Sequence, residues 1–238
     1  MKEQVGMEKE PEGRVEFLQR VCGAVARRAP ERPTSGPSEI TREVGRSVRD
    51  GQLADIFVGN ARAAGIDARI VPTRTTVVDA VNEITRTYSI RTLHAWNDGT
   101  VERYGLESLA EMSGLEIQRW NPEQPEESRK AAAFGMQCGL TSADYAIAET
   151  GSLVLTTSRE KGRSVSLLGD VHIAIVETDR LIPDLYDLPQ RLLKDHPALL
   201  PSNVTIISGP SKTADIELQM VVGVHGPRHV FAILVQSD

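Results

Sequence analysis

From residue 51 onward, segments with helical periodicity alternate with short segments that are almost wholly apolar. A strand without polar alternation is buried on both faces, and helices between such strands are the crossovers of a parallel sheet. The alternation therefore predicts an α/β fold in three layers, with a mostly parallel sheet covered by helices. The expected helices are 53–64, 75–88, 106–112, 125–137 and 184–193, and the expected strands are 68–71, 92–96, 115–120, 152–156, 171–177, 204–208 and 229–235.

The first 50 residues follow a different pattern. Residues 1–13 are polar and have no periodicity, whereas 14–28 carry apolar side chains every three or four positions. That spacing predicts one amphipathic helix. A proline-rich stretch, 30–37, then separates this helix from the rest of the chain. We therefore expect an N-terminal arm over residues 1–50 and an α/β domain over residues 51–238.

Two cysteines, Cys22 and Cys138, limit the redox chemistry of the chain. An iron–sulfur cluster needs about four thiolates, and these two residues do not form a CxxC pair. No two histidines have the spacing of a metal site. We therefore expect neither a metal nor a redox cofactor in this chain.

Charge and hydropathy exclude two classes of partner. The 27 Lys and Arg against 33 Asp and Glu give a net charge of −6, whereas nucleic-acid binding needs a concentrated basic surface. The longest apolar run, 230–235, is far shorter than the ~20 residues that span a bilayer. The N-terminus has no apolar core of a signal peptide. The expectation is a cytoplasmic protein that binds no nucleic acid and has no membrane span.

Ligands of open parallel sheets bind beyond the carboxyl ends of the strands, so the polar segments next to the apolar strands are candidate sites. The first is 139–157, in which Glu149, Thr150 and Gly151 directly precede an apolar strand. Glu149 is a candidate catalytic acid or acyl-accepting nucleophile, with Thr150 and Gly151 as ligand contacts. The alternative is a structural turn, in which Glu149 is a cap and Gly151 supplies a permissive backbone dihedral.

The second candidate segment is 208–217, which follows the apolar strand 204–208. Its glycine, hydroxyl and amide groups are suited to binding an anion, and its lysine adds a positive charge. The alternative is that Ser211 or Thr213 caps a helix. The candidate ligand-binding residues are Gly209, Ser211, Lys212, Thr213, Asp215 and Glu217.

The third candidate segment is 223–228, where His225 lies between two glycines just before the last strand. A histidine in such a loop is a candidate general acid or base, with Gly226 beside it as a ligand contact. The alternative is a turn histidine without a special role. We expect all three segments to meet in one cleft at the carboxyl edge of the sheet.

These segments carry a resemblance to a known family. The runs GLTSADYAIAETGSLVL at 139–155, SLLGDVHIAIVE at 166–177, SGPSKTADIE at 208–217 and GVHGPR at 223–228 resemble the lactate utilisation protein C family, which carries the LUD domain. The likeness covers roughly residues 50–238 in order. Relatives usually have a proline-rich stretch where this chain has Gly169 and Asp170.

The resemblance implies a fold similar to the sugar-isomerase and coenzyme A transferase group. It also implies a non-redox component of an L-lactate utilisation system, in which partner subunits carry the iron–sulfur clusters and L-lactate is oxidised to pyruvate. The site at the strand ends would then bind a small carboxylate or another anion. A looser likeness links Glu149-Thr150-Gly151 to the Glu-Asn-Gly turn of some coenzyme A transferases. The alternative function is an autonomous enzyme for acyl or coenzyme A transfer or for sugar-phosphate isomerisation.

Overall fold

The computed structural model describes residues 13, 15–20, 23, 52–214, 220–223 and 225–236. The chain divides into two units, Met1–Val44 and Gly45–Asp238. In the first unit, residues 15–20 and 23 are helical, within the segment where the sequence predicts a helix. Val21, Cys22 and Val25, which belong to the predicted apolar face, lie outside the described residues.

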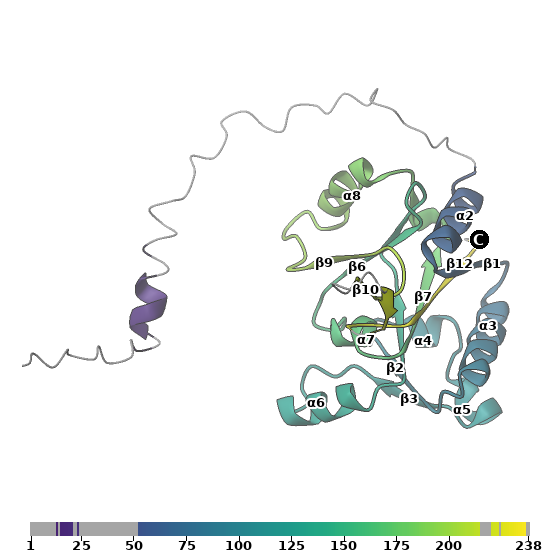
Figure 1. The fold of residues 1–238 in the computed structure, drawn as a ribbon, viewed down its shortest axis with the longest axis horizontal. Helices are drawn as coiled ribbons and strands as arrows, with labels where there is room; N and C mark the ends of the chain where they lie inside the picture. The colour runs from purple at the N-terminus through teal and green to yellow at the C-terminus, as the bar shows by residue number, and fades with distance from the viewer. Residues whose placement is uncertain are drawn as a thin grey trace, which may run out of the picture. The chain divides into compact units, whose positions relative to one another are not determined.

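The second unit is built on a six-stranded sheet with the strand order β1-β12-β7-β4-β2-β3 (Figure 1). Every neighbouring pair of these strands is parallel. The predicted α/β fold with a largely parallel sheet is therefore confirmed. The strands are β1 (Asp67–Val71), β2 (Thr92–Ala95), β3 (Glu116–Arg119), β4 (Cys138–Ser142), β7 (Val171–Glu177) and β12 (His229–Val235).

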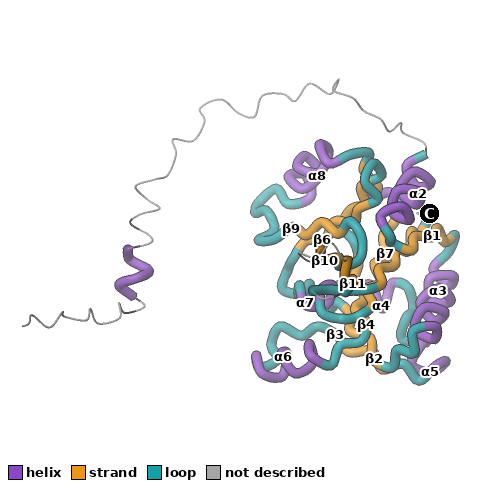
Figure 2. Tube along the Cα trace, in the orientation of Figure 1, coloured by secondary structure: helices purple, strands orange, loops and turns teal. Residues whose placement is uncertain are grey.

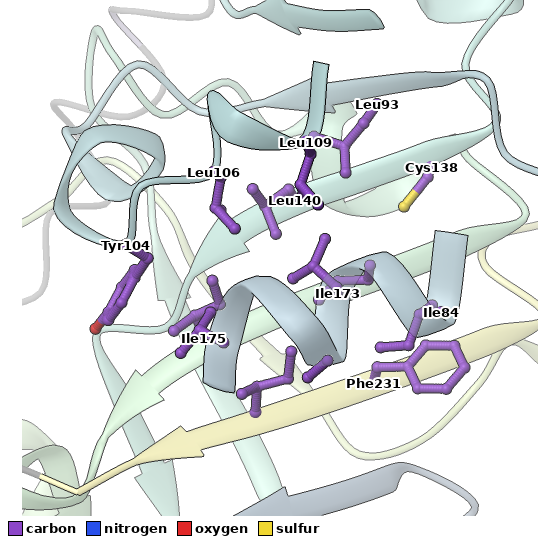
Figure 3. Close-up of a cluster of buried hydrophobic side chains, with 14 of the residues drawn as sticks. Ile84, Leu93, Tyr104, Leu106, Leu109, Cys138, Leu140, Ile173, Ile175 and Phe231 are labelled. Atoms are coloured by element: carbon purple, nitrogen blue, oxygen red, sulfur yellow. The ribbon is translucent and has the colours of Figure 1, made fainter. Parts of the chain in front are cut away.

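One face of this sheet is covered by α3 (Arg74–Thr87), α4 (Thr100–Arg103) and α5 (Ser108–Ser113). Helix α3 begins with a capping box at Thr73, and its buried residues Val77, Val81 and Ile84 recur with helical spacing. Figure 3 shows Ile84 beside Phe231 of β12 in this core. Tyr104 lies at the rim of the same core, with its hydroxyl oxygen pointing away from the apolar side chains (Figure 3).

The other face is covered by α2 (Leu53–Ala64), α7 (Ser164–Leu167) and a second sheet, whereas α6 (Glu126–Phe134) has no buried residue. This sheet has the order β8-β5-β6-β9 and is mixed: β5–β8 is parallel, whereas β5–β6 and β6–β9 are antiparallel. Helix α8 (Leu188–Asp195) packs on its outer side, and α8 and α3 lie at opposite sides of the strands (Figure 2). The strands are β5 (Tyr145–Ile147), β6 (Ser152–Thr156), β8 (Leu181–Ile182) and β9 (Val204–Ile207).

The second sheet corrects one expectation of the sequence. The predicted strands 152–156 and 204–208 exist as β6 and β9, but they do not belong to the parallel sheet. Strand β6 is buried on both faces because one of its faces packs against the six-stranded sheet and the other against α8. A doubly buried strand has the same apolar sequence in either sheet, so hydropathy could not assign it.

The remaining elements are short. The 3₁₀ turns Thr178–Arg180 and Leu185–Asp187 flank β8, and the second occupies the start of the predicted helix 184–193. Asp184 caps this turn by accepting hydrogen bonds from the amides of Tyr186 and Asp187. A hairpin, β10 (Lys212–Ala214) and β11 (Met220–Val222), precedes β12. Within the part of the chain that the structure describes, no helix has the length and apolar character to cross a bilayer.

Candidate functional site

A cleft of about 420 Å³ opens at the carboxyl edge of the six-stranded sheet. Strand β2 lies between β3 and β4, so the chain leaves β2 toward one edge of the sheet and leaves β4 toward the other. Such a reversal separates two neighbouring loops and creates the crevice in which open α/β sheets bind ligands. The cleft is lined by Asp98 after β2, by Ser142 and Asp144 at the end of β4, and by Glu177 at the end of β7.

Asp98 and Ser142 join the two sides of this reversal. The Oγ of Ser142 donates a hydrogen bond of 2.6 Å to Oδ2 of Asp98. The Oδ1 of Asp98 accepts a hydrogen bond of 3.1 Å from the amide of Thr100, at the start of α4. The carboxylate is therefore fixed in position at the cleft by one bond from each side.

Asp144 and Lys161 form a shielded ion pair at the same cleft. Their Oδ1 and Nζ atoms are 2.8 Å apart, and their side chains are only 19% and 18% exposed. The Oδ2 of Asp144 also accepts hydrogen bonds from the amide and the hydroxyl of Thr156, at 2.7 and 2.9 Å. The ammonium group of Lys161 lies 5.2 Å from the centre of the Trp96 ring. Both charges are thus held by several contacts, and we regard the pair as part of the framework of the cleft.

Two arginines with half-exposed side chains also line the cleft. Arg103 lies 3.2 Å from the carboxylate of Glu177, and Arg180 lies 2.8 Å from that of Asp195. Each ion pair is made by an Nη1 atom, whereas a guanidinium has five N–H donors. Arg103 and Arg180 can therefore bind a further carboxylate while they keep their own partners.

Two tyrosine hydroxyls complete the cleft as neutral donors. Tyr104 donates to Glu177 at 3.1 Å, and burial, with the Glu177 charge as the next cause, raises the pKa of Tyr104 to about 12. Tyr145 donates to Asp195 at 2.6 Å. Burial first, and then this bond, also raises the pKa of Tyr145, whereas the bond lowers the pKa of Asp195. Both phenols therefore stay protonated at neutral pH.

Glu149, Thr150 and Gly151 lie elsewhere, in the turn between β5 and β6. The side-chain amide of Asn60 on α2 donates to the carbonyl oxygens of Ala148 and Glu149, both at 2.9 Å. Gly151 has a φ of +63°, and a Cβ atom there would lie 2.1 Å from the amide nitrogen of Ala61. The turn is thus packed directly on the backbone of α2, and the side chain of Glu149 is exposed.

The segment 208–214 packs beside this turn. The Oγ atoms of Ser152 and Ser208 are 2.7 Å apart, and the hydroxyl of Thr150 donates to Ser152 at 2.8 Å. A Cβ on Gly209 would lie 2.6 Å from the carbonyl oxygen of Ala64, the last residue of α2. Lys212 and Thr213 belong to β10, whereas Asp215 and Glu217 lie outside the described residues.

The segment 223–228 is joined to Ser211. The amide of Ser211 donates to the carbonyl of Pro227 at 2.9 Å, and a Cβ on Gly226 would lie 3.3 Å from Cβ of Ser211. His225 is exposed. The amide of Arg228 donates to the carbonyl of Asp170, just before β7. This contact places the segment at the amino edge of the parallel sheet.

The structure therefore contradicts the expectation that these three segments meet in one cleft at the carboxyl edge of the sheet. The segments do contact one another, through α2 and Ser211, but a loop that precedes a parallel strand lies at the opposite edge from a loop that follows one. Of the candidate residues that the structure describes, none lines the carboxyl-edge cleft. The first segment nevertheless reaches it through Ser142, Asp144 and Tyr145.

The sequence analysis missed the rest of the cleft. Asp98 could have been found, because it follows the predicted strand 92–96 by two residues. Glu177 is the last residue of the predicted strand 171–177 and could also have been found. The remaining charged residues lie in short helices, turns and loops or at the end of a helix, where no periodic pattern marks them, and they are Arg103, Lys161, Arg180 and Asp195. Within the described residues, no cluster of three or more His, Cys, Asp or Glu side chains has an arrangement that could hold a metal ion.

The fold and the cleft define an α/β protein with a polar ligand crevice at the reversal point of a parallel sheet. The chain belongs to the LUD domain family, whose model matches residues 54–235. It is 38% identical over 160 residues to lactate utilization protein C of Halalkalibacterium halodurans, covering 66% of this chain and 68% of that protein. It is 32% identical over 232 residues to lactate utilization protein C of Bacillus subtilis, covering 93% and 95% of the two chains.

A solved structure has the same fold. The crystal structure of a DUF162 family protein from Deinococcus radiodurans is similar with a TM-score of 0.59 and 22% sequence identity. The match covers 79% of this chain and 99% of that one. At this identity the likeness shows the fold alone.

Proposed function

We propose that this protein takes part in L-lactate utilisation as a non-redox component that acts with iron–sulfur partner subunits. The observation that carries the proposal is the similarity, along 93% of the chain, to a protein named for lactate utilization. In this role the protein binds a small 2-hydroxy or 2-oxo carboxylate in the cleft at the carboxyl edge, and the partners carry out the electron transfer.

The cysteine content of the chain supports this division of labour. Oxidation of L-lactate to pyruvate releases two electrons, and amino-acid side chains other than cysteine pairs do not accept them readily. The two cysteines of the chain are too few for a cluster, and Cys138 is buried on β4, where burial raises the pKa of its thiol. Electron acceptors on partner subunits fit this composition.

The cleft chemistry supports a hydroxy or oxo carboxylate as the ligand. Arg103 and Arg180 supply donors for the carboxylate. Asp98, fixed by Ser142, accepts from a hydroxyl group on the neighbouring carbon, and the remaining guanidinium N–H groups of the two arginines can donate to a keto oxygen. The volume of about 420 Å³ lies within the range of small-molecule sites, which is about 300–1,000 Å³.

Growth on L-lactate tests the role, and cleft variants test the site. Deletion of the gene is expected to abolish growth on L-lactate, and the wild-type gene to restore it. Asp98→Asn should restore growth poorly, whereas Glu126→Gln, on the exposed start of α6, should act like the wild type. Normal growth of the deletion strain on L-lactate would contradict the proposed role in lactate utilisation. Full rescue by Asp98→Asn would contradict the proposed ligand site in the cleft but would not affect the proposed role in lactate utilisation.

Purification of the tagged protein from lactate-grown cells tests the partners. Co-purification of iron–sulfur proteins, seen as visible absorption that the chain lacks when purified alone, is the expected result. Turnover of an acyl-coenzyme A or a sugar phosphate by the isolated chain would instead support an autonomous enzyme.

A further inference from the structure

We propose that a second cleft, enclosed by β2, β3, α6 and α7, is a binding site for a small molecule that carries an oxyanion group on an apolar body. This cleft has a volume of about 390 Å³. Its lining includes two arginines, one histidine and several hydroxyl and amide side chains, but no aspartate or glutamate. The proposal is independent of the lactate role and concerns a site on a different part of the fold.

The charges of the two clefts differ in one respect. In the carboxyl-edge cleft, Arg103, Lys161 and Arg180 each have a carboxylate partner. In the second cleft, Arg119 is paired with Glu102 and Glu107, but Arg129 on α6 forms no ion pair with any described residue. Its guanidinium carbon lies 5.8 Å from the centre of the Trp120 ring, which holds it at the cleft. Arg129 is therefore a positioned cation that has no anionic partner within the described part of the chain.

Two polar groups around this cleft, of which the Arg129 Nε atom is shielded from solvent, have no hydrogen-bond partner among the described residues. The Nε atom of Arg129 is shielded from solvent and has no partner among the described residues. His94, on β2, is only 7% exposed, and the structure records no hydrogen bond to its ring from the residues that it describes. A shielded polar group without a partner destabilises the protein, and a ligand with acceptor oxygens would offer a hydrogen-bond partner to both side chains.

His172 is a second buried histidine, but it lies outside the second cleft. His172 is also buried, and its Nδ1 atom also lacks a partner within the described part of the chain. However, the Nε2 atom of His172 is bonded to the hydroxyl of Thr141 at 2.9 Å, and His172 does not line the second cleft. His94 is 7% exposed, against 0% for His172, and lines the cleft, so a bound molecule can reach it.

The chemistry of the lining defines the class of ligand. Arg129 binds one oxyanion group through its planar donors, and Ser128 and Ser164 add hydroxyl donors. The indole of Trp120 and the side chains of Met136 and Val165 supply an apolar wall. An aromatic or aliphatic carboxylate and the corresponding phosphate share this chemistry, and the binding test separates them.

The test uses benzoate and phenyl phosphate as probes, with benzyl alcohol as the uncharged control. Titrations of the full chain are followed through the indole N–H signal of Trp120 and the ring signals of His94 by NMR. We expect at least one of the two anions to shift these signals saturably and to bind at least tenfold more tightly than benzyl alcohol. The tighter of the two anions identifies the headgroup.

Two variants assign the binding to this cleft. Arg129→Gln should weaken the anion at least tenfold, whereas Lys130→Gln should leave its affinity unchanged. Lys130 is the matched control, because it is the next residue on α6, carries the same charge, is exposed and does not line the cleft. If Arg129→Gln fails to fold, His94→Gln replaces it, with the same expected loss. The absence of saturable shifts with both anions, or equal affinity of the wild type and Arg129→Gln, would overturn the proposal.

Discussion

The hydroxyl of Ser142 donates a 2.6 Å hydrogen bond to the carboxylate of Asp98, across the point where the strand order of the parallel sheet reverses. Ser142 ends β4, and Asp98 follows β2, so the bond closes the floor of the crevice that these two diverging strand ends create. The amide of Thr100 holds the second carboxylate oxygen of Asp98. Removal of the Ser142 hydroxyl therefore leaves the carboxylate present but held from one side only.

The Ser142→Ala variant tests this relationship. Loss of one partly buried hydrogen bond should lower the free energy of unfolding by about 1 kcal/mol. Growth on L-lactate should fall more than this small loss of stability explains, because Asp98 is no longer fixed. Ser108→Ala is the control: it loses a hydrogen bond of 2.7 Å to the carbonyl of Gly105, outside the cleft. Equal growth of both variants on lactate would contradict the prediction.

The Gly151→Ala variant tests why the Glu149-Thr150-Gly151 turn has its sequence. A Cβ at Gly151 adds a left-handed backbone cost of about 1–2 kcal/mol to a clash with the backbone of α2, worth about 1–3 kcal/mol more. Gly105→Ala is the matched control, because Gly105 has a φ of +68° but nothing within 4 Å of the added atom. Urea unfolding should show the larger loss for Gly151→Ala. Equal losses would mean that α2 does not pack on the turn as described.

This turn also shows what sequence reasoning can and cannot reach. The sequence correctly predicts that the residues around Glu149 precede a buried strand. The φ of +63° at Gly151 fits the structural alternative, in which a glycine supplies a permissive backbone dihedral. The sequence could not reveal that β6 belongs to a second sheet and runs antiparallel to its neighbours. That direction puts the turn against α2 instead of at the carboxyl edge of the main sheet.

The main sheet was more predictable than the site. Strands 171–177 and 229–235 match their expected bounds, because each is a seven-residue run buried almost throughout. Strand β4 was missed because Gly139, Thr141 and Ser142 interrupt its apolar pattern. Gly139 is required there: a Cβ would lie 1.7 Å from the carbonyl oxygen of Val165 on α7. A contact between distant segments explains that residue, and a single sequence does not display it.

The pair formed by Asp144 and Lys161 should contribute measurably to stability. A double-mutant cycle with Asp144→Asn and Lys161→Met should give a coupling free energy above about 1.5 kcal/mol, because both side chains are shielded and removal of one leaves the other charge unpaired. The pair of Glu126 and Lys130 on α6 is the reference, since these side chains are 70% and 65% exposed. Its coupling should be about 0.3–0.5 kcal/mol. Urea unfolding of the wild type, the four single variants and the two double variants measures both values, and similar values would contradict the shielding of the first pair.

The pH dependence of stability should contain a contribution from His172. Burial lowers the pKa of His172 from 6.5 to about 4 in the folded protein. Between these values the unfolded chain binds a proton that the folded chain does not, so the free energy of unfolding falls as the pH decreases from about 6.5 toward 4. Over the whole interval, the loss from this one group approaches roughly 3 kcal/mol.

The His172→Gln variant isolates that contribution. The variant should be less stable than the wild type at pH 7.5, because it disturbs the contact of Nε2 with the Thr141 hydroxyl in a fully buried position. Its stability should nevertheless fall less steeply on acidification, since the group that takes up the proton on unfolding is gone. His94, whose pKa burial also lowers, and all the carboxylates titrate in both proteins, so their contributions cancel in the difference. The free energy of unfolding in urea, measured at intervals from pH 7.5 to 5, should therefore show the two proteins converging below pH 6.5. Parallel curves over this range would mean that His172 is protonated as readily in the folded protein as in the unfolded chain.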